Sequence, residues 1–476
     1  MANHPNIILI MTDQQRYDSI AASGYPYMKT PTLDRLHKEG SSFSNCFITG
    51  AACVPSRASL FSGFYPHSIG VMRNGIHWSK TWVGDLKEKG YRCVNIGKMH
   101  VYPFDKPAGF DERYIVENKD RFLEAKNYFD EWDKALAANG LVKQQRALYR
   151  KRSDYKHALG AFHWELPERF HSDMFIGDMA NWWLRSYPKT EPLFLQIGFV
   201  GPHPPYDPTP PYHEMYRDAK IPMPRMLPSD LEGQPRALKV LRQHHADIDH
   251  DSIVWSMNPS PEQLKRLKEH YYANVTMIDA KIESIMQTLN ELGYLDNSIV
   301  IFTTDHGDSL GDHGHIQKWN MYEEVVHVPL IFWSKDEKIP AQEVKGMCQL
   351  HDIGPTLFEM LGMDHSQMEG RSLLPALQKK EWQPYSHVFC EEERDSIMTD
   401  AKLQTMVRSE DWKFVHFLEE TDGQVYDLKN DPAEEVNLWQ DALGKKIRQE
   451  AMEVLCEWHL QSNLQTQAAR GSFIDP

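Results

Sequence analysis

Cysteine is scarce in this sequence, and its copies are scattered. The 476-residue chain has six cysteines and no Cys-x-x-Cys pair. A structural zinc site or a disulfide scaffold needs cysteines that are clustered or regularly paired. The sequence therefore excludes both, and we expect the cysteines other than Cys53 to be small core residues.

Long apolar runs are also absent. No window approaches the 18 consecutive apolar residues of a membrane span, so we predict none. The first residues, MANHPNIILIM, lack the basic segment and the cleavage site of a signal peptide and lead directly into TDQQ. We expect a first core strand here, and a cytoplasmic protein or a mature form from which a leader has been removed.

Positive charge is in short supply. Lys and Arg total 52 against 67 Asp and Glu, which gives a formal net charge of -15. A surface of this sign repels nucleic acid and other long polyanions. We therefore expect no nucleic-acid partner, and an anionic substrate must be held by local cations in a pocket.

Short apolar runs alternate with helical patterns over roughly the first 370 residues. This alternation predicts an α/β fold, with a large mostly parallel sheet covered by helices on both faces. The predicted strands are residues 6–11, 91–96, 192–200, 298–304 and 328–333, and the predicted helices are residues 32–39, 82–89, 173–187 and 262–292.

Two stretches depart from this rhythm. Residues 120–163 are charged and aromatic with a mostly helical pattern, and residues 201–261 are rich in Pro and His with little periodicity. We interpret both as insertions near the C-terminal edge of the sheet, where α/β proteins bind ligands.

The pattern changes again from about Ser386. Short strands are predicted at residues 402–409, 412–418 and 424–428, followed by a terminal helix from about Ala442. We predict a main domain over residues 1–380 and a smaller C-terminal α+β subdomain over residues 381–476. The C-terminal tail is a candidate for contacts in an oligomer.

The segment CVPSR places Cys53 near the start of a predicted helix and Arg57 four residues later. Both features lower the pKa of a thiol and favour an anion beside it. For the pentapeptide alone, a buried cysteine that happens to lie near Pro and Arg remains the alternative.

The longer segment CVPSRASLFSGFYPH resembles the signature of the type I sulfatases of the alkaline phosphatase superfamily. That signature is C-x-P-S-R, then a small-residue helix and G-x-x-P-H. The segments TPTLDRLHKEG, GYRCVNIGK, VPLIF, DIGPTLFEMLG and VYDLKNDPAEEVNL also resemble sulfatase segments in the expected order. The resemblance covers nearly the whole chain except the two insertions, and it implies an alkaline-phosphatase-like fold.

The resemblance further implies that Cys53 is converted to formylglycine by a formylglycine-generating maturation enzyme. A thiol that attacked sulfur would leave a stable thiosulfate ester, whereas an aldehyde hydrate offers two hydroxyls on one carbon. One hydroxyl attacks sulfur, the bond from sulfur to the ester oxygen breaks, and the alcohol leaves. The other, once deprotonated, expels sulfate and regenerates the aldehyde.

Polar pairs follow two predicted strands: Asp13 with Gln14, and Asp305 with His306. Each residue alone is more typical of a cap or a loop, but together they can bind a hard divalent cation. With Cys53 they match the sulfatase metal site, which implies one ion, Ca²⁺ first, with Mn²⁺ or Mg²⁺ as alternatives. Many sulfatases have Asp-Asp and Asp-Asn here, so Gln14 is the least secure ligand. Choline-sulfatase-like enzymes and phosphonate monoester hydrolases resemble this chain at these positions.

Cationic groups complete the resemblance. Lys98 and His100 follow one predicted strand, His203 follows another, and Lys318 comes thirteen residues after the aspartate of the second pair. The family uses such groups around the sulfate, which implies that Lys98 and Lys318 bind its oxygens and that Arg57 steadies formylglycine. His100 and His203 are candidates for deprotonating the hydrate and protonating the leaving oxygen, in an order left open.

Other residues receive weaker assignments. We interpret His313 and His315 as structural residues of a glycine-rich turn and not as zinc ligands. Trp78, Trp164 and Trp319 lie near motif segments and are candidates for lining a pocket. The residues that suit a sulfated sugar are Arg73, His77, His163, Trp164, Tyr206 and Tyr212.

These observations predict a sulfatase that acts on a sulfated mono- or oligosaccharide or an aryl sulfate. The alternative is a phosphonate monoester or phosphodiester hydrolase on the same scaffold, since the Asp-Gln and Asp-His pairs suit both. Ser56 is the residue of the common sulfatase signature and favours sulfate. A third reading is a non-catalytic binding protein, which the intact set of site residues disfavours.

Overall fold

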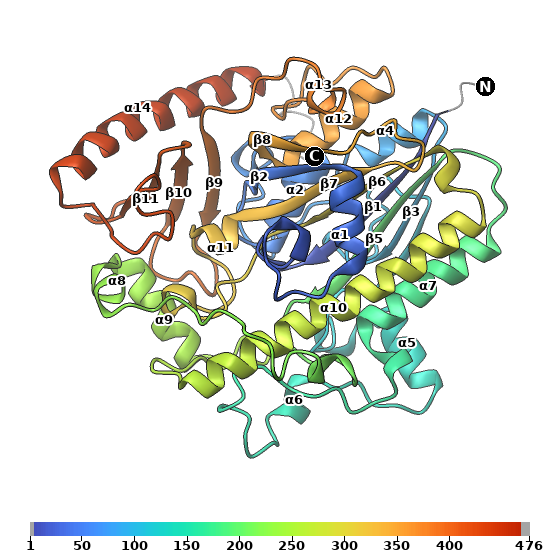
Figure 1. Ribbon diagram of the computed structural model, residues 1–476, viewed down its shortest axis with the longest axis horizontal. Helices are drawn as coiled ribbons and strands as arrows, with labels where there is room; N and C mark the ends of the chain where they lie inside the picture. The colour runs from blue at the N-terminus through green and yellow to red at the C-terminus, as the bar shows by residue number, and fades with distance from the viewer. Residues whose placement is uncertain (1–3, 468–476) are drawn as a thin grey trace.

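The computed structural model describes residues 4–467, and an eight-stranded sheet forms its centre (Figure 1). The strands are β1 (Asn6–Asp13), β2 (Ser41–Phe47), β3 (Arg92–Gly97), β4 (Glu112–Ile115), β5 (Leu193–Pro202), β6 (Ser298–Thr304), β7 (His327–Trp333) and β8 (Gln342–Gln349). Their order is β4-β3-β5-β1-β6-β7-β2-β8. All neighbours are parallel except the two pairs that contain β7. The large, mostly parallel sheet is therefore confirmed.

Helices cover both faces of this sheet because its central strands are apolar on both sides. Alternate residues of β1 join two different cores: Ile8 and Ile10 pack with one set of helices, and Leu9 and Met11 with the other. The first set is α1 (Pro31–Glu39), α7 (Ser172–Ser186) and α10 (Pro261–Glu291); the second is α2 (Cys53–Ser62), α4 (Val83–Glu88) and α12 (Ile353–Met360). Shorter helices are α3 (Pro66–Ile69), α11 (Glu323–Val326) and α13 (Leu374–Leu377).

The strands and helices predicted for this sheet are all present, with ends within two residues of the prediction. The prediction missed β2, β4 and β8. Serines break the apolar pattern of β2, and the structure shows how they are tolerated. Ser41 donates a hydrogen bond to the carbonyl oxygen of Pro340 at 2.8 Å, and the Ser42 hydroxyl lies 2.8 Å from Nδ1 of His37. Satisfied hydroxyls let a polar strand occupy a buried position.

The two insertions differ from their predicted character. Residues 120–163 are not mostly helical: turns surround α5 (Glu131–Ala138) and α6 (Arg146–Tyr149). Several of their charged side chains form ion pairs between different segments of the chain. Nε of Arg146 bonds Asp120 at 2.8 Å and lies 3.8 Å from Asp249 of the second insertion.

The second insertion, residues 201–261, contains two helices that were not predicted, α8 (Pro228–Gly233) and α9 (Arg236–Asp247). The apolar face of α9, with Leu238 and Leu241, is buried in the core on the α2 side of the sheet. The helical spacing of the apolar residues in α9 was not recognised, because prolines and histidines dominate the surrounding sequence.

A separate antiparallel sheet follows the main one. Its strands are β9 (Val388–Glu393), β10 (Leu403–Arg408), β11 (Trp412–Phe417) and β12 (Gln424–Asp427), in the order β12-β11-β10-β9, and α14 (Ala442–Gln465) packs against it. The last three strands and the helix are confirmed, whereas β9, which ends in three glutamates, was missed. The division at residue 380 stays a prediction, and the end of the tail considered for oligomer contacts lies outside the described residues.

No helix among residues 4–467 is both long and apolar enough to cross a lipid bilayer.

Candidate active site

Two buried aspartates meet at the C-terminal edge of the main sheet. Asp13 ends β1 and Asp305 follows β6, and these two strands are parallel neighbours. The backbone N–H groups of Gln14 and His306 both donate to Oδ1 of Asp305, each at 3.0 Å. Parallel strands thus bring together two carboxylates that lie almost 300 residues apart in the sequence.

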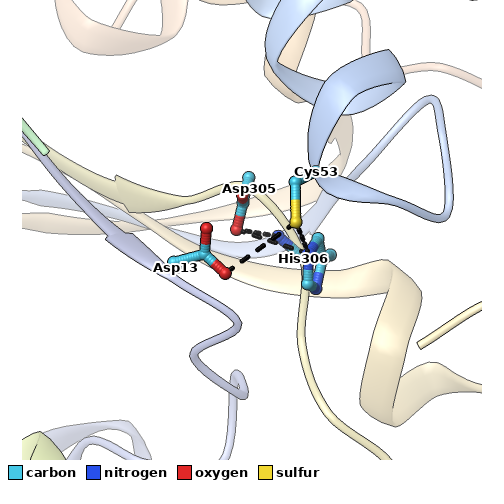
Figure 2. A group of neighbouring side chains, drawn as sticks. All are labelled: Asp13, Cys53, Asp305 and His306. Atoms are coloured by element: carbon cyan, nitrogen blue, oxygen red, sulfur yellow. Dashed lines mark hydrogen bonds and ion pairs between the residues drawn. The ribbon is translucent and has the colours of Figure 1, made fainter. Parts of the chain in front are cut away.

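Cys53 lies directly beside them as the first residue of α2 (Figure 2). Its Sγ is 3.2 Å from Nε2 of His306, 3.1 Å from Nζ of Lys318 and 3.9 Å from Oδ1 of Asp13. Burial and Asp13 raise the pKa of the thiol, but Lys318, Lys98 and His306 outweigh them and lower it below its ordinary value. The position therefore favours negative charge on the side chain that occupies it.

The rest of the CVPSR segment holds the two aspartates. Arg57 is fully buried, with Nε 2.7 Å from Oδ2 of Asp305 and a terminal nitrogen 3.2 Å from Oδ2 of Asp13. The Ser56 hydroxyl donates to the carbonyl oxygen of Asp305 at 2.5 Å. Arg57 thus binds both carboxylates and Ser56 fixes the backbone of Asp305, which explains why Ser and Arg stand at this spacing from Cys53.

Two lysines add positive charge to the same place. Nζ of Lys98 lies 2.5 Å from Oδ2 of Asp13, and Lys318 donates to Oε1 of Gln14 at 2.9 Å. Burial alone would raise the pKa of Asp13, but Lys98, His203 and Arg57 hold it well below its ordinary value. Asp13 is therefore ionised at neutral pH, and the site concentrates three cationic side chains around two carboxylates.

His203 is buried beside these groups. Its backbone N–H donates to the carbonyl oxygen of Asp13 at 3.1 Å, its Nδ1 donates to the carbonyl oxygen of Pro204 at 2.8 Å, and its Nε2 lies 3.5 Å from Asp251. Burial, followed by Lys318, keeps the pKa of His203 well below its ordinary value.

His100 adopts a left-handed backbone conformation, with φ of 63°. Its backbone N–H bonds the carboxylate of Glu117, and its side-chain Nδ1 has no hydrogen-bond partner among residues 4–467. Burial, then Lys98 and Arg57, hold the pKa of this imidazole well below its ordinary value too. Both candidate histidines are thus poised as neutral imidazoles.

A cavity of about 290 Å³ opens over Cys53. Four predicted site residues line it together with Cys53: Lys98, His100, His203 and Lys318. Arg57 is fully buried and does not line it. The rest of the lining forms a wall. It comes from the two insertions and the loop after β9, with Arg121, Arg146, His250, Asp251 and Asp395, and from Asn74, Phe104, Glu117, Asn118 and Trp319. The structure thus brings together the predicted site residues and adds a wall that the sequence did not reveal.

Several residues that sequence reasoning assigned to a sugar do not line this cavity. Tyr206 is buried, and its hydroxyl donates to Asp308 at 2.6 Å. Trp164 packs in the core, and His163 lies beside His213 and His270. Tyr212, Arg73 and His77 also lie outside the cavity wall, as does Trp78, whereas Trp319 belongs to it.

Asp308 is a site residue that the sequence analysis passed over. Its Oδ2 accepts from Nε2 of Gln14 at 2.6 Å, which orients the amide so that its oxygen faces Lys318. Asp308 lies in the same TTDHGDSLGDHGH run as Asp305. The sequence could have indicated Asp308, because it is a carboxylate within the same run that supplied Asp305 and His306.

His313 and His315 do not share one ligand cluster. Nδ1 of His313 lies 2.9 Å from Asp230, and its ring stacks on Tyr322 at 3.7 Å. Burial opposes its charge, but Asp230 and Glu324 outweigh burial and raise the pKa of His313 to about 10. Its contacts are those of a buried, ion-paired structural residue.

Comparison with known proteins identifies the family. Residues 5–363 match the family described as Sulfatase, and residues 311–461 match the one described as N-sulphoglucosamine sulphohydrolase, C-terminal. The first match spans most of the chain and includes every predicted site residue.

Three relatives are similar over nearly their whole length. An arylsulfatase of Clostridium perfringens is 28% identical, covering 91% of this chain and 90% of its own. An N-acetylglucosamine-6-O-sulfatase of Bacteroides thetaiotaomicron is 27% identical (96% and 86%). The multifunctional alkaline phosphatase superfamily protein PehA of Trinickia caryophylli is 29% identical (96% and 95%).

Among solved structures, the phosphonate monoester hydrolase of Agrobacterium radiobacter superimposes with a TM-score of 0.80 at 24% identity, covering 96% of both chains. This likeness shows the alkaline-phosphatase-like fold. The family match and the named relatives show the activity class: the chain belongs to the sulfatase family and is a sulfuric ester hydrolase.

Proposed function

We propose that the protein hydrolyses a small sulfate ester, of a sugar or an aryl alcohol, with formylglycine derived from Cys53 as the nucleophile and one divalent cation beside it. The observation that carries this proposal is the position of Cys53. Its Sγ belongs to one cluster with two carboxylates and an imidazole, lies 3.1 Å from Nζ of Lys318, and lines a cavity.

The donor set fits a divalent cation. Asp13, Cys53, Asp305 and His306 each place a ligand atom within 4.8 Å of the others, and all four are buried. Carboxylate oxygens suit Ca²⁺, our first choice, and also Mn²⁺ and Mg²⁺, which stay the alternatives. Gln14 stays the weakest ligand candidate because its oxygen already accepts from Lys318. When bound, the ion polarises the sulfate oxygens and favours ionisation of a hydroxyl on residue 53.

Lys98 and Lys318 are proposed to hold the sulfate oxygens. Both line the cavity, and Nζ of Lys318 is already within hydrogen-bond distance of the side chain of residue 53. Their charge opposes the negative charge that develops on the sulfuryl oxygens during transfer. Formylglycine supplies two hydroxyls on one carbon, so sulfate transfer and sulfate release use the same residue.

The two imidazoles are proposed to move protons. A neutral imidazole can accept a proton, and a protonated one can return it to the leaving oxygen. Nδ1 of His100 has no hydrogen-bond partner within residues 4–467, and Nε2 of His203 lies 3.5 Å from Asp251 at the cavity wall. We assign the transfers to the pair, with the order open.

Phosphonate monoester hydrolysis is the second candidate, because the phosphonate monoester hydrolase of Agrobacterium radiobacter shares the fold and PehA is a multifunctional relative. The test uses converted, metal-loaded protein with 4-nitrophenyl sulfate and a 4-nitrophenyl phosphonate monoester. We expect kcat/KM to be at least about tenfold higher on the sulfate. A site stabilises best the transition state to which its charges and shape are complementary, and we propose that this is the transition state of sulfate transfer. Faster turnover of the phosphonate would reverse the assignment, and the Cys53→Ala protein corrects for background.

A further inference from the structure

We infer that Asp395 binds a hydroxyl group of a sugar leaving group and so selects sulfated sugars over aryl sulfates. The inference rests on the proposed sulfatase function and names the residue that recognises the alcohol part of the substrate. It concerns the wall of the cavity, away from the sulfate.

Asp395 belongs to the loop that follows β9 in the small sheet. Asp395 and Ile397 line the cavity together with His250 of the second insertion and with Trp319, the neighbour of Lys318. Three segments far apart in the sequence therefore converge on the wall beside the catalytic lysine, where the alcohol part of a bound ester would lie.

Among the described residues, only neutral donors hold the Asp395 carboxylate. Its Oδ1 accepts from the backbone N–H groups of Ile397 and Met398 at 2.7 and 2.8 Å, and its Oδ2 accepts from the indole N–H of Trp319 at 3.1 Å. A carboxylate accepts about four hydrogen bonds, so acceptor capacity remains. The two backbone bonds also fix the loop, so the position of the carboxylate is set before any ligand binds.

The other carboxylates of the cavity wall are already paired with cations. Asp251 lies 3.0 Å from Arg121 and 3.4 Å from Arg146, and Glu117 lies 3.6 Å from Arg113. Within residues 4–467, no basic nitrogen lies within 4.0 Å of Asp395. A carboxylate that faces a partly closed cavity is stabilised by a hydrogen-bond donor from a ligand.

The composition of the wall favours a hydroxyl donor over an ammonium group. The lining cations are Lys98, Arg121, Arg146 and Lys318, and the lining carboxylates are Glu117, Asp251 and Asp395. This balance disfavours a cationic ligand. Phe104, Leu123 and Ile397 add apolar wall that can pack against the C–H groups of a ring. A single hydroxylated ring bearing one sulfate matches both features, whereas the ring of 4-nitrophenyl sulfate offers Asp395 no donor.

The test is the variant Asp395→Asn, assayed on methyl glucoside monosulfates that differ in the sulfated position and on 4-nitrophenyl sulfate. We expect kcat/KM on the sugar ester that the parent protein hydrolyses best to fall by about 10- to 100-fold, the loss typical of a hydrogen bond to a charged group. The value for the aryl ester should stay within about twofold. Asp400→Asn is the matched control, because Asp400 pairs with Arg236 and does not line the cavity.

Two further measurements separate this inference from the proposed function. Titration calorimetry of the Cys53→Ala protein, with and without Asp395→Asn, reports sugar-sulfate affinity without turnover. A sugar ester lacking the recognised hydroxyl should bind the two proteins equally. If the parent hydrolyses no ester, the proposed function fails, yet weaker sugar-sulfate binding by the Asp395→Asn protein still supports the inference. Equal losses on sugar and aryl esters, or no loss on either, would overturn it, as would a selective loss on an ammonium-bearing alkyl sulfate.

Discussion

The floor and the wall of the cavity are built in different ways. The floor consists of side chains at the ends of β1 and β6, at the start of α2, and of two lysines, and its carboxylates and cations bond one another. The wall consists mostly of loops from the two insertions and from the small C-terminal sheet, together with Phe104, Glu117 and Trp319. The ends of regular elements position the carboxylates of the floor, whereas ion pairs and backbone hydrogen bonds of loops position the wall.

We interpret this difference as a division of roles, with catalysis at the floor and substrate specificity at the wall. In the proposed function, the cations, carboxylates and imidazoles of the floor surround the transferred group and so suit any sulfate ester. The wall is proposed to contact only the alcohol part of the substrate. Changes to the floor should therefore affect all esters alike, and changes to the wall should affect esters according to their alcohol.

The largest effect is expected from Cys53→Ala, which removes the nucleophile's precursor. Activity on both sugar and aryl sulfates should fall on the order of 10⁴-fold or more. Initial rates on both esters check this, with circular dichroism to verify the fold. If the variant kept activity, and the ratio of its rates on sugar and aryl esters equalled that of the parent protein, a metal-activated water would be the nucleophile instead.

Removal of the divalent cation is expected to come next. Treatment with a chelator should lower kcat on both esters on the order of 10³-fold, since the ion stabilises the charge of the transferred group. Adding back Ca²⁺, Mn²⁺ or Mg²⁺ separately should restore it and rank the three ions. Full activity in chelator, with metal loss verified by elemental analysis, would contradict the assignment of Asp13, Asp305 and His306 as ligands.

Lys318→Ala should cost about 10²- to 10³-fold in kcat/KM on both esters, the range for removing one charged donor from a transition state. Lys345→Ala, on the exposed surface, serves as the control. A loss confined to sugar esters would show that Lys318 contacts the alcohol part of the substrate and not the sulfate, which would contradict its assignment to the floor.

The smallest effect is expected from Arg146→Ala. Arg146 joins the two insertions through Asp120 and Asp251, at 2.8 and 3.4 Å. We expect KM on sugar esters to rise a few-fold and the free energy of unfolding to fall by about 1 kcal/mol, since the pair network is partly exposed. Steady-state kinetics and denaturant titration measure the two. An equal change in kcat on aryl esters would show that the wall also positions the floor.

The floor was predictable because its residues lie in short, ordered motifs. Cys53 and Arg57 share one pentapeptide, and Asp13 and Asp305 each mark the end of an apolar strand. Parallel strands bring such ends to one edge, so the sequence pattern translated directly into proximity. The same periodicity predicted the nine strands and helices of the main sheet that were named.

The wall was not predictable, because its residues are brought together only by the folded loops. Asp395 and Arg121 belong to no motif, and they lie in separate segments, Arg121 in the first insertion and Asp395 in the loop after β9. The aromatic residues chosen for sugar binding show the same limit. Tyr206 is an aromatic residue of a type that often binds sugars, yet its hydroxyl donates a hydrogen bond to Asp308 in the interior.

The most direct test of the account is the mass of the peptide that contains Cys53, compared between protein made with and without a formylglycine-generating enzyme. Conversion of the thiol to the aldehyde lowers the mass by about 18 Da. We predict that the lighter peptide appears only with the enzyme and that hydrolysis of a sulfate ester rises in proportion to the converted fraction. An intact thiol together with unchanged hydrolysis would contradict the claim that Cys53 becomes the nucleophile.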